Sequence, residues 1–190
     1  MVGGDLLERA VGFALGSLAA VSDADLSRRT PCSDWDLVML LRHLEDSVDA
    51  VCDGIEQGRI DLGADIPAAD DPLGAVRSGL CRLLGAWLCA KCDAITVCGL
   101  PLSTVVLADI AALEITVHAW DIGSACADPR TIPTPLATEL LSVARVAVTG
   151  RRDPLFGARV PVPASACQSD RLVAFFGRDP AVWKLPSAQR

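Results

Sequence analysis

Residues 112–127 read ALEITVHAWDIGSACA, and this stretch carries two carboxylates and one imidazole in a largely apolar run. Glu114, His118 and Asp121 occupy positions i, i+4 and i+7, which lie on one face of an α-helix. A carboxylate among apolar neighbours is costly unless it is paired or bound to a metal. The stretch therefore predicts a buried helix, over about residues 104–125, with a polar and functional face.

The chain holds one other histidine, His43, in the segment LLRHLED. His43 lies at the edge of an apolar stripe whose members recur at spacings of three and four, as in an amphipathic helix. Facing helices of a bundle often build metal sites from such side chains. His43, Glu114 and His118 are a sufficient set of ligands for a divalent metal. With zinc they would leave a fourth position open, which is typical of catalytic sites.

A simpler interpretation of the same residues is open. A glutamate followed four residues later by a histidine is common on helices and is often only a surface contact. The apolar surroundings and the use of both histidines favour the metal site. Asp121, one turn beyond His118, could accept a hydrogen bond from an imidazole N–H or act as a proton acceptor in the site.

Composition limits the function classes. The chain has 190 residues, of which 51% are hydrophobic and 22% charged, so a globular domain with an aliphatic core is expected. A net charge of −7, with no basic run longer than a pair such as Arg151-Arg152, argues against a nucleic-acid partner. Asp5, Glu8 and Arg9 interrupt what would be the apolar core of a signal peptide, and no long charge-free apolar stretch follows. We expect a cytoplasmic protein with no membrane span.

Apolar periodicity predicts an all-α fold, an up-down four-helix bundle with a C-terminal extended strap and a short final helix. Ser33 and Ser169 are expected to cap the second and the final helix. Residues 95–97 are expected to form no more than a strand fragment. The whole chain, 1–190, is expected to be a single domain, with 150–190 as an appendage packed on the bundle. The helices are expected over residues 5–21, 34–57, 73–89, 104–125, 134–149 and about 169–176.

Eight cysteines raise the question of a second metal site. Cys89, Cys92 and Cys98 are close in sequence, but a structural zinc needs four ligands. Cys81 or Cys126 would have to complete the set across the fold. Ordinary reduced thiols are the favoured interpretation, because the chain shows no export signal.

Three segments together resemble a known family: TPCSDWDLVMLLRHL (30–44), ALEITVHAWDIGSACA (112–127) and FGARVPVPASACQSDRLVAFFGRDP (156–180). They resemble the DinB-like (DinB/YfiT) metal-binding four-helix proteins. Within that family the chain is most similar to the branch of mycothiol-dependent maleylpyruvate isomerase and mycothiol S-transferases. The resemblance implies a DinB-like bundle, a divalent metal that is usually zinc, with nickel as an alternative, and a low-molecular-weight thiol as co-substrate.

The resemblance also implies roles for individual residues. The metal triad of the family falls on His43, Glu114 and His118. Asp121 falls on the HxWD pattern and is assigned a catalytic role, as an acid–base or orienting group. Trp35 matches a tryptophan of the family near the start of the second helix and is assigned to substrate binding. Arg152 and Arg159 of the strap are also assigned to substrate binding, from their charge rather than from the resemblance, because they could receive an anionic substrate or a thiol carboxylate. Solvated surface arginines are the simpler alternative for the last two.

The implied chemistry is thiol transfer or thiol-assisted isomerisation. A free thiol has a pKa of about 8.5, and coordination to a metal deprotonates it. The thiolate could then add to a small electrophile, giving S-transfer, or add and leave again after rotation, giving cis–trans isomerisation. A metal-dependent hydrolase that activates water, or a non-catalytic metal-binding protein, could use the same triad.

The preference for Arg over Lys and the many alanines agree with an actinobacterial source. A homodimer is one of the oligomeric states left open.

Overall fold

The computed structural model describes residues 3–32, 35–60, 69–126, 128, 130–149 and 157–183. The long helices are α1 (Gly3–Leu18), α2 (Leu37–Gln57), α3 (Pro72–Leu88), α4 (Thr104–Ala125) and α5 (Thr134–Ala147), and the shorter ones are η1 (Asp23–Asp25), α6 (Gln168–Phe175) and α7 (Pro180–Trp183). Strands β1 (Arg59–Ile60), β2 (Ala94–Val97) and β3 (Leu100–Ser103) form one small sheet in that order. Within these residues, every helix is too short or too polar to cross a membrane.

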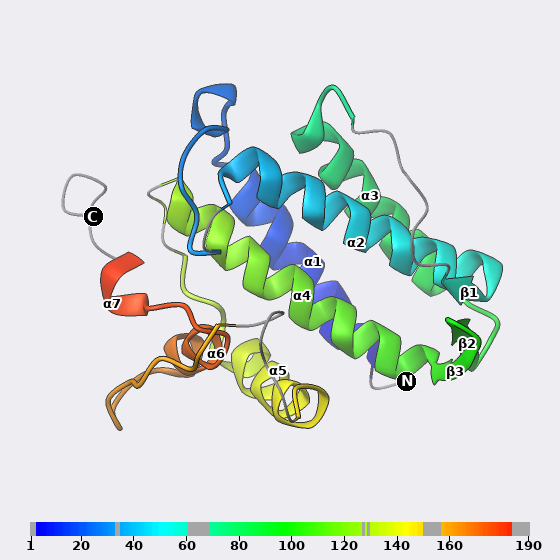
Figure 1. Cartoon of the computed structure of the whole chain (residues 1–190). Coiled ribbons are helices and arrows are strands. Elements are labelled where there is room, and N and C mark those ends of the chain that lie inside the picture. The colour runs from blue at the N-terminus through cyan, green and yellow to red at the C-terminus, as the bar shows by residue number, and fades with distance from the viewer. Residues whose placement is uncertain are drawn as a thin grey trace.

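Helices α1 to α4 form a bundle in which α1 packs on α3 and α4, and α2 packs on the same two helices. Helices α5 and α6 pack beside it, on the side of α4 (Figure 1). Contacts from α1, α2 and α5 cover α4 on several sides, which explains why α4 is apolar around most of its circumference. Between Ala111 and Ala125 every residue is buried except Glu114. The prediction of a mostly helical fold is confirmed.

The observed helix directions differ from the strict alternation that the predicted up-down bundle implies. β1 follows α2 directly and pairs in parallel with β2, which follows α3, so both helices end beside the sheet. At the other end, Arg77 near the start of α3 donates a hydrogen bond to the carbonyl of Leu18 at the end of α1. α2 and α3 therefore run in the same direction (Figure 1). The connection over residues 58–71, at about 3.3 Å per residue, is long enough to return along a helix of about 30 Å.

Two predicted helix caps need correction. α2 begins later than expected, with Asp36 as its N-cap, and the Asp36 carboxylate accepts a hydrogen bond from the backbone N–H of Met39. Ser33, the expected cap, lies outside the described residues. Ser169 lies inside α6 and does not cap it. Its hydroxyl instead accepts a hydrogen bond from the N–H of Ile132, which ties α6 to the segment before α5.

The predicted strand fragment at residues 95–97 is one arm of a β-hairpin. β2 and β3 pair antiparallel from Ala94 opposite Ser103 to Val97 opposite Leu100. Cys98 and Gly99 form the turn with positive φ angles of 48° and 80°. Two consecutive positive φ angles match the twist of the flanking strands in a two-residue hairpin, and glycine adopts them without strain. The hairpin covers the end of the bundle where α4 begins.

The described part of the strap, residues 157–166, has no helix or strand and runs beside α6. The N–H of Val160 donates a hydrogen bond to the carbonyl of Ala174. Gly177 follows α6 with a φ of 84°, and a Cβ there would come within 3.0 Å of the strap backbone. Glycine is therefore required at this turn. The turn directs the next residue, Arg178, into the interior, where it is 8% exposed.

Candidate metal centre

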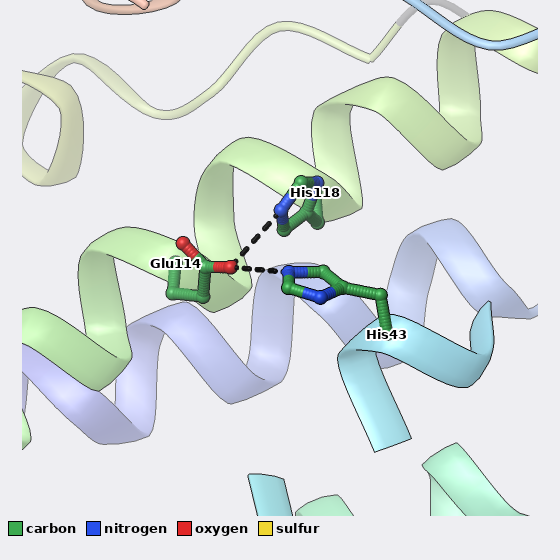
Figure 2. Close-up of side chains that lie close together, drawn as sticks. All are labelled: His43, Glu114 and His118. Carbon is green, nitrogen blue, oxygen red and sulfur yellow. Dashed lines mark hydrogen bonds and ion pairs between the residues drawn. The ribbon is translucent and has the colours of Figure 1, made fainter. Parts of the chain in front are cut away.

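Three side chains from two facing helices meet at one point (Figure 2). His43 comes from α2, and Glu114 and His118 come from α4. The Nε2 atoms of His43 and His118 lie 2.8 Å and 3.1 Å from the same Oε1 atom of Glu114. One ligand atom of each residue lies within 4.8 Å of the others, and no second such group of His, Cys, Asp or Glu is found among the described residues. The structure thus brings together the three residues that the sequence analysis selected.

A buried hydrogen-bond network fixes the orientation of His118 through its Nδ1 atom. The Nδ1 atom of His118 lies 3.1 Å from Oδ2 of Asp121, which is completely buried. Arg178 donates hydrogen bonds from Nη2 and Nε to the two oxygens of Asp121, at 2.8 Å and 3.2 Å, and from Nη1 to the carbonyl of Phe176. With Nδ1 engaged by a carboxylate, the Nε2 atom of His118 faces Glu114. Histidines that bind metals are commonly oriented in this way.

The charged groups of this network shift one another's pKa values toward the ionised forms. Burial alone would raise the pKa of Glu114, but the two imidazoles outweigh it and hold that pKa well below its usual range. Burial alone would lower the pKa of His118, but Asp121 and Glu114 raise it to about 9. The pKa of Asp121 is lowered, because Arg178 and His118 overcome the effect of burial. In the metal-free protein His118 therefore keeps a second proton at neutral pH.

A cavity of about 480 Å³ opens beside the three residues. Trp35 lines it, with its ring centroid 4.8 Å from the ring of His43. Cys32 lines the same region, and Val148 and Phe176 add apolar wall from the C-terminal part of the chain. Pockets of 300–1,000 Å³ are typical of small-molecule sites. The cavity is therefore large enough for a small molecule to reach the His–Glu–His group.

The donor set fits a divalent metal such as zinc or nickel. Imidazole nitrogens and a carboxylate oxygen are ligands that these ions accept. His43 and Glu114 keep about a third of their side-chain surface exposed, at 35% and 34%, whereas His118 is buried. An ion bound by the three groups would therefore face the cavity and could accept a further ligand from it.

The other predicted site residues have different positions. Asp121 orients His118, as described above, and Trp35 lines the cavity. Arg159 is exposed, with its guanidinium 4.2 Å from the centroid of the Phe175 ring, and it is not part of the cavity wall. Arg152 lies outside the described residues. The assignment of these arginines to substrate binding stays a prediction.

The alternative metal site at the cysteines is not assembled among the described residues. Cys89, Cys92 and Cys98 are exposed and free, and none belongs to a group of potential metal ligands within the described part of the chain. The interpretation as ordinary thiols stays a prediction.

Sequence reasoning missed two residues of the site. Arg178 stands in the FFGRDP end of the third family-like segment, and the arginine after Gly177 was the available signal. Cys32 stands in TPCSDWD and was treated only as part of that segment. In the structure Cys32 lines the cavity, and burial raises the pKa of its thiol despite the nearby guanidinium of Arg178. The Cys32 thiol is thus protonated at neutral pH.

Comparison with known proteins gives one family match. The sequence model described as the mycothiol maleylpyruvate isomerase N-terminal domain matches residues 7–123, which include all three residues of the His–Glu–His group. Two curated relatives are the uncharacterized proteins Rv0738 and MT0763 of Mycobacterium tuberculosis, strains H37Rv and CDC 1551. Each is 29% identical over 180 residues, which cover 90% of this chain and 94% of the relative. No solved structure matches the chain at a significant level.

Proposed function

The chain belongs to the DinB-like family of the mycothiol maleylpyruvate isomerase N-terminal domain, and we propose that it is a metal-dependent, thiol-using enzyme. In this proposal His43, Glu114 and His118 hold a divalent metal, zinc or nickel. A low-molecular-weight thiol of the mycothiol type is the co-substrate, and a small electrophile is the substrate. The observation that carries the proposal is the convergence of two imidazole nitrogens on one carboxylate beside a cavity of small-molecule size.

Each side chain of the site would have a distinct role. A bound metal would supply a thiolate at neutral pH by lowering the pKa of a coordinated thiol. Asp121 keeps Nε2 of His118 directed at the metal position, and Arg178 fixes Asp121 in turn. Trp35 and Phe176 provide apolar wall, which limits the access of water to the reacting groups. Asp121 is therefore a positioning residue in this account.

The charge of the cavity wall favours S-transfer over isomerisation of a dicarboxylate. Apart from the two histidines, Arg178 is the one basic side chain among the described residues that line the cavity. Its donors already bind Asp121 and the carbonyl of Phe176. A substrate with two carboxylates would thus find no free guanidinium in the described wall. An uncharged electrophile that receives the thiol sulfur fits these surroundings better.

The position of Arg178 also supports the proposal that residues 1–190 form one domain. The sequence model of the family ends before the C-terminal part of the chain, yet Arg178 from that part binds Asp121 inside the bundle. α6 packs on α5, and α5 packs on α4. A site shared in this way requires both parts of the chain to fold together.

Thiol-dependent turnover tests the proposed function. The zinc-loaded protein would be incubated with a fluorogenic alkyl halide, with and without mycothiol. We expect conjugation that needs the thiol and falls to background in His43→Ala, whereas Arg82→Ala, on the far surface of α3, keeps full activity. Thiol-independent hydrolysis of an ester substrate by the same site would instead indicate a hydrolase. Absence of any turnover by the metal-loaded protein would favour a non-catalytic metal-binding role.

A further inference from the structure

A second cavity of about 290 Å³ adjoins the first. Its walls come from α2, from α4 and from the small sheet, which closes this end of the bundle (Figure 1). Ile110 and Glu114 line both cavities. One carboxylate of the candidate metal centre therefore stands at the boundary between them. We call the second cavity the apolar chamber.

The side chains around the apolar chamber are almost all hydrocarbon. Val51 of α2, Leu102 of β3 and Ala111 of α4 are examples from its three walls. Ser47 and Glu114 are the two polar members of the described lining, and no basic residue is among them. An anionic group would find no positively charged partner in this lining, whereas an uncharged apolar group would lose its contact with water at no electrostatic cost.

The chamber is large enough for one such group. An apolar cavity of about 150 Å³ engineered into another protein binds benzene. Val51 and Leu102 are only half-buried, so the chamber is reachable from outside, and its shared residues Ile110 and Glu114 place it next to the first cavity. The small side chain of Ala111 leaves space between α4, α2 and the hairpin. A ligand could therefore occupy it without displacing core residues.

We propose that the apolar chamber binds the uncharged hydrocarbon part of the electrophile, an aromatic ring or a short alkyl chain, while the reacting carbon lies in the first cavity. This inference rests on the proposed function and names the substrate class of that site. Val51, Leu102 and Ala111 are then residues that determine specificity. The thiol occupies the first cavity, and Glu114 separates the two binding regions.

Binding of a neutral apolar dye tests the chamber independently of catalysis. Equilibrium dialysis would measure the affinity of N-phenyl-1-naphthylamine for the full-length protein and three variants. Val51→Trp fills the chamber and Leu102→Lys places a charge in it, and we expect each to weaken binding by about tenfold or more. Val148→Trp narrows only the first cavity and should leave the affinity unchanged. If Val51→Trp does not fold, Leu102→Lys still tests the chamber, because a charged side chain is tolerated at the half-buried position of Leu102 on β3.

Turnover of a homologous series tests the same point on the substrate. In each reaction the thiol sulfur bonds to the alkyl carbon, the carbon–bromine bond breaks, bromide leaves with its electron pair and the thiol proton goes to the buffer. In the wild type, kcat/KM should rise roughly threefold to fourfold per methylene from bromoethane until the chamber is full. In Leu102→Lys it should stay nearly flat.

The two experiments separate the two proposals. Dye affinity that is equal in wild type, Val51→Trp and Leu102→Lys would overturn the chamber and leave the proposed function standing. Dye binding lost in both variants, together with no thiol-dependent turnover of any bromide, would overturn the proposed function and retain the chamber as an apolar ligand site. A wild-type kcat/KM that is independent of chain length would also overturn the assignment of the electrophile to the chamber.

Discussion

Two arginine–carboxylate clusters in this molecule have similar contact distances and opposite surroundings. On the surface between α2 and α3, Arg82 reaches Asp49, Asp53 and Glu56 at 2.7–3.3 Å, and all four side chains are partly exposed. In the interior, Arg178 reaches Asp121 at 2.8 Å, and both are buried. Exposed ion pairs gain little because water screens them, whereas a buried charge left without its partner is costly. Equal geometry therefore does not mean equal importance.

The difference extends to what each cluster positions. The surface cluster contacts no group of the candidate site, and its removal would leave the helices packed as before. The interior pair fixes Asp121, which fixes His118, which faces Glu114. A buried ion pair is weak support for stability as such. Here its clearest effect is to hold one imidazole in one orientation.

The largest effect is expected for Arg178→Met, which leaves the Asp121 carboxylate buried and unpaired. We expect a loss of about 3–5 kcal/mol in the free energy of unfolding, measured by urea denaturation of the metal-free protein. The double variant Arg178→Met with Asp121→Asn removes both charges and should recover much of that loss. A single variant as stable as the wild type would mean that the interior pair behaves like the surface one.

A smaller effect is expected for Asp121→Asn, which keeps the shape of the side chain and removes its charge. Zinc affinity should fall about 10- to 100-fold, because the carboxylate no longer orients His118 or supports it as a ligand. Competition with a chromophoric chelator measures this affinity. Asp53→Asn in the surface cluster is the matched control and should bind zinc as the wild type does. Equal affinities for the two variants would remove Asp121 from the account.

The raised pKa of His118 predicts a pH dependence. Its folded-state pKa of about 9 lies above the ordinary value of 6.5. The metal-free protein therefore has this contribution to stability in full below pH 6.5 and loses it as the pH rises through about 9. Metal binding at neutral pH must displace the proton, so zinc affinity should increase with pH over the same window.

Calorimetry in two buffers of different ionisation enthalpy checks this directly. Zinc binding near neutral pH should release about one proton from His118 to the buffer in the wild type. Asp121→Asn should release a smaller fraction, because one of the groups that raise the pKa of His118 is gone. An observed binding enthalpy that does not change between the buffers would show that His118 is already neutral in the metal-free protein.

The smallest effect is expected for Arg82→Ala, which removes the centre of the surface cluster. The free energy of unfolding should change by less than about 1 kcal/mol, and the change should shrink further as salt is added. Urea denaturation at low and high salt measures both. A loss as large as that of Arg178→Met would erase the contrast between the two clusters.

The sequence predicted the relative positions of site residues that lie on a single helix. Glu114 and His118 are one turn apart on a single helix, so their common face followed from helical spacing. His43 could be added because it is the one other histidine in the chain. Arg178 could not be placed, because its contact with Asp121 depends on the path of the strap and on the turn at Gly177.

Features that depend on the packing of several elements could not be predicted from the sequence either. The shared direction of α2 and α3 depends on how the two helices pack in the bundle, and apolar periodicity within each helix does not report its direction. The apolar chamber exists because the β2–β3 hairpin stands beside α2 and α4. Its lining residues have the same apolar character as ordinary core residues, so the sequence could not separate a cavity wall from a packed interior.

The most direct test of the central claim is the metal content of the untagged protein, measured by mass spectrometry after dialysis against zinc. We expect about one bound equivalent in the wild type and in the surface control Glu56→Ala, and less than about 0.1 in Glu114→Ala. A wild-type protein that holds no metal and takes none up would contradict that claim. The His–Glu–His group would then be only a hydrogen-bonded cluster inside a helical bundle.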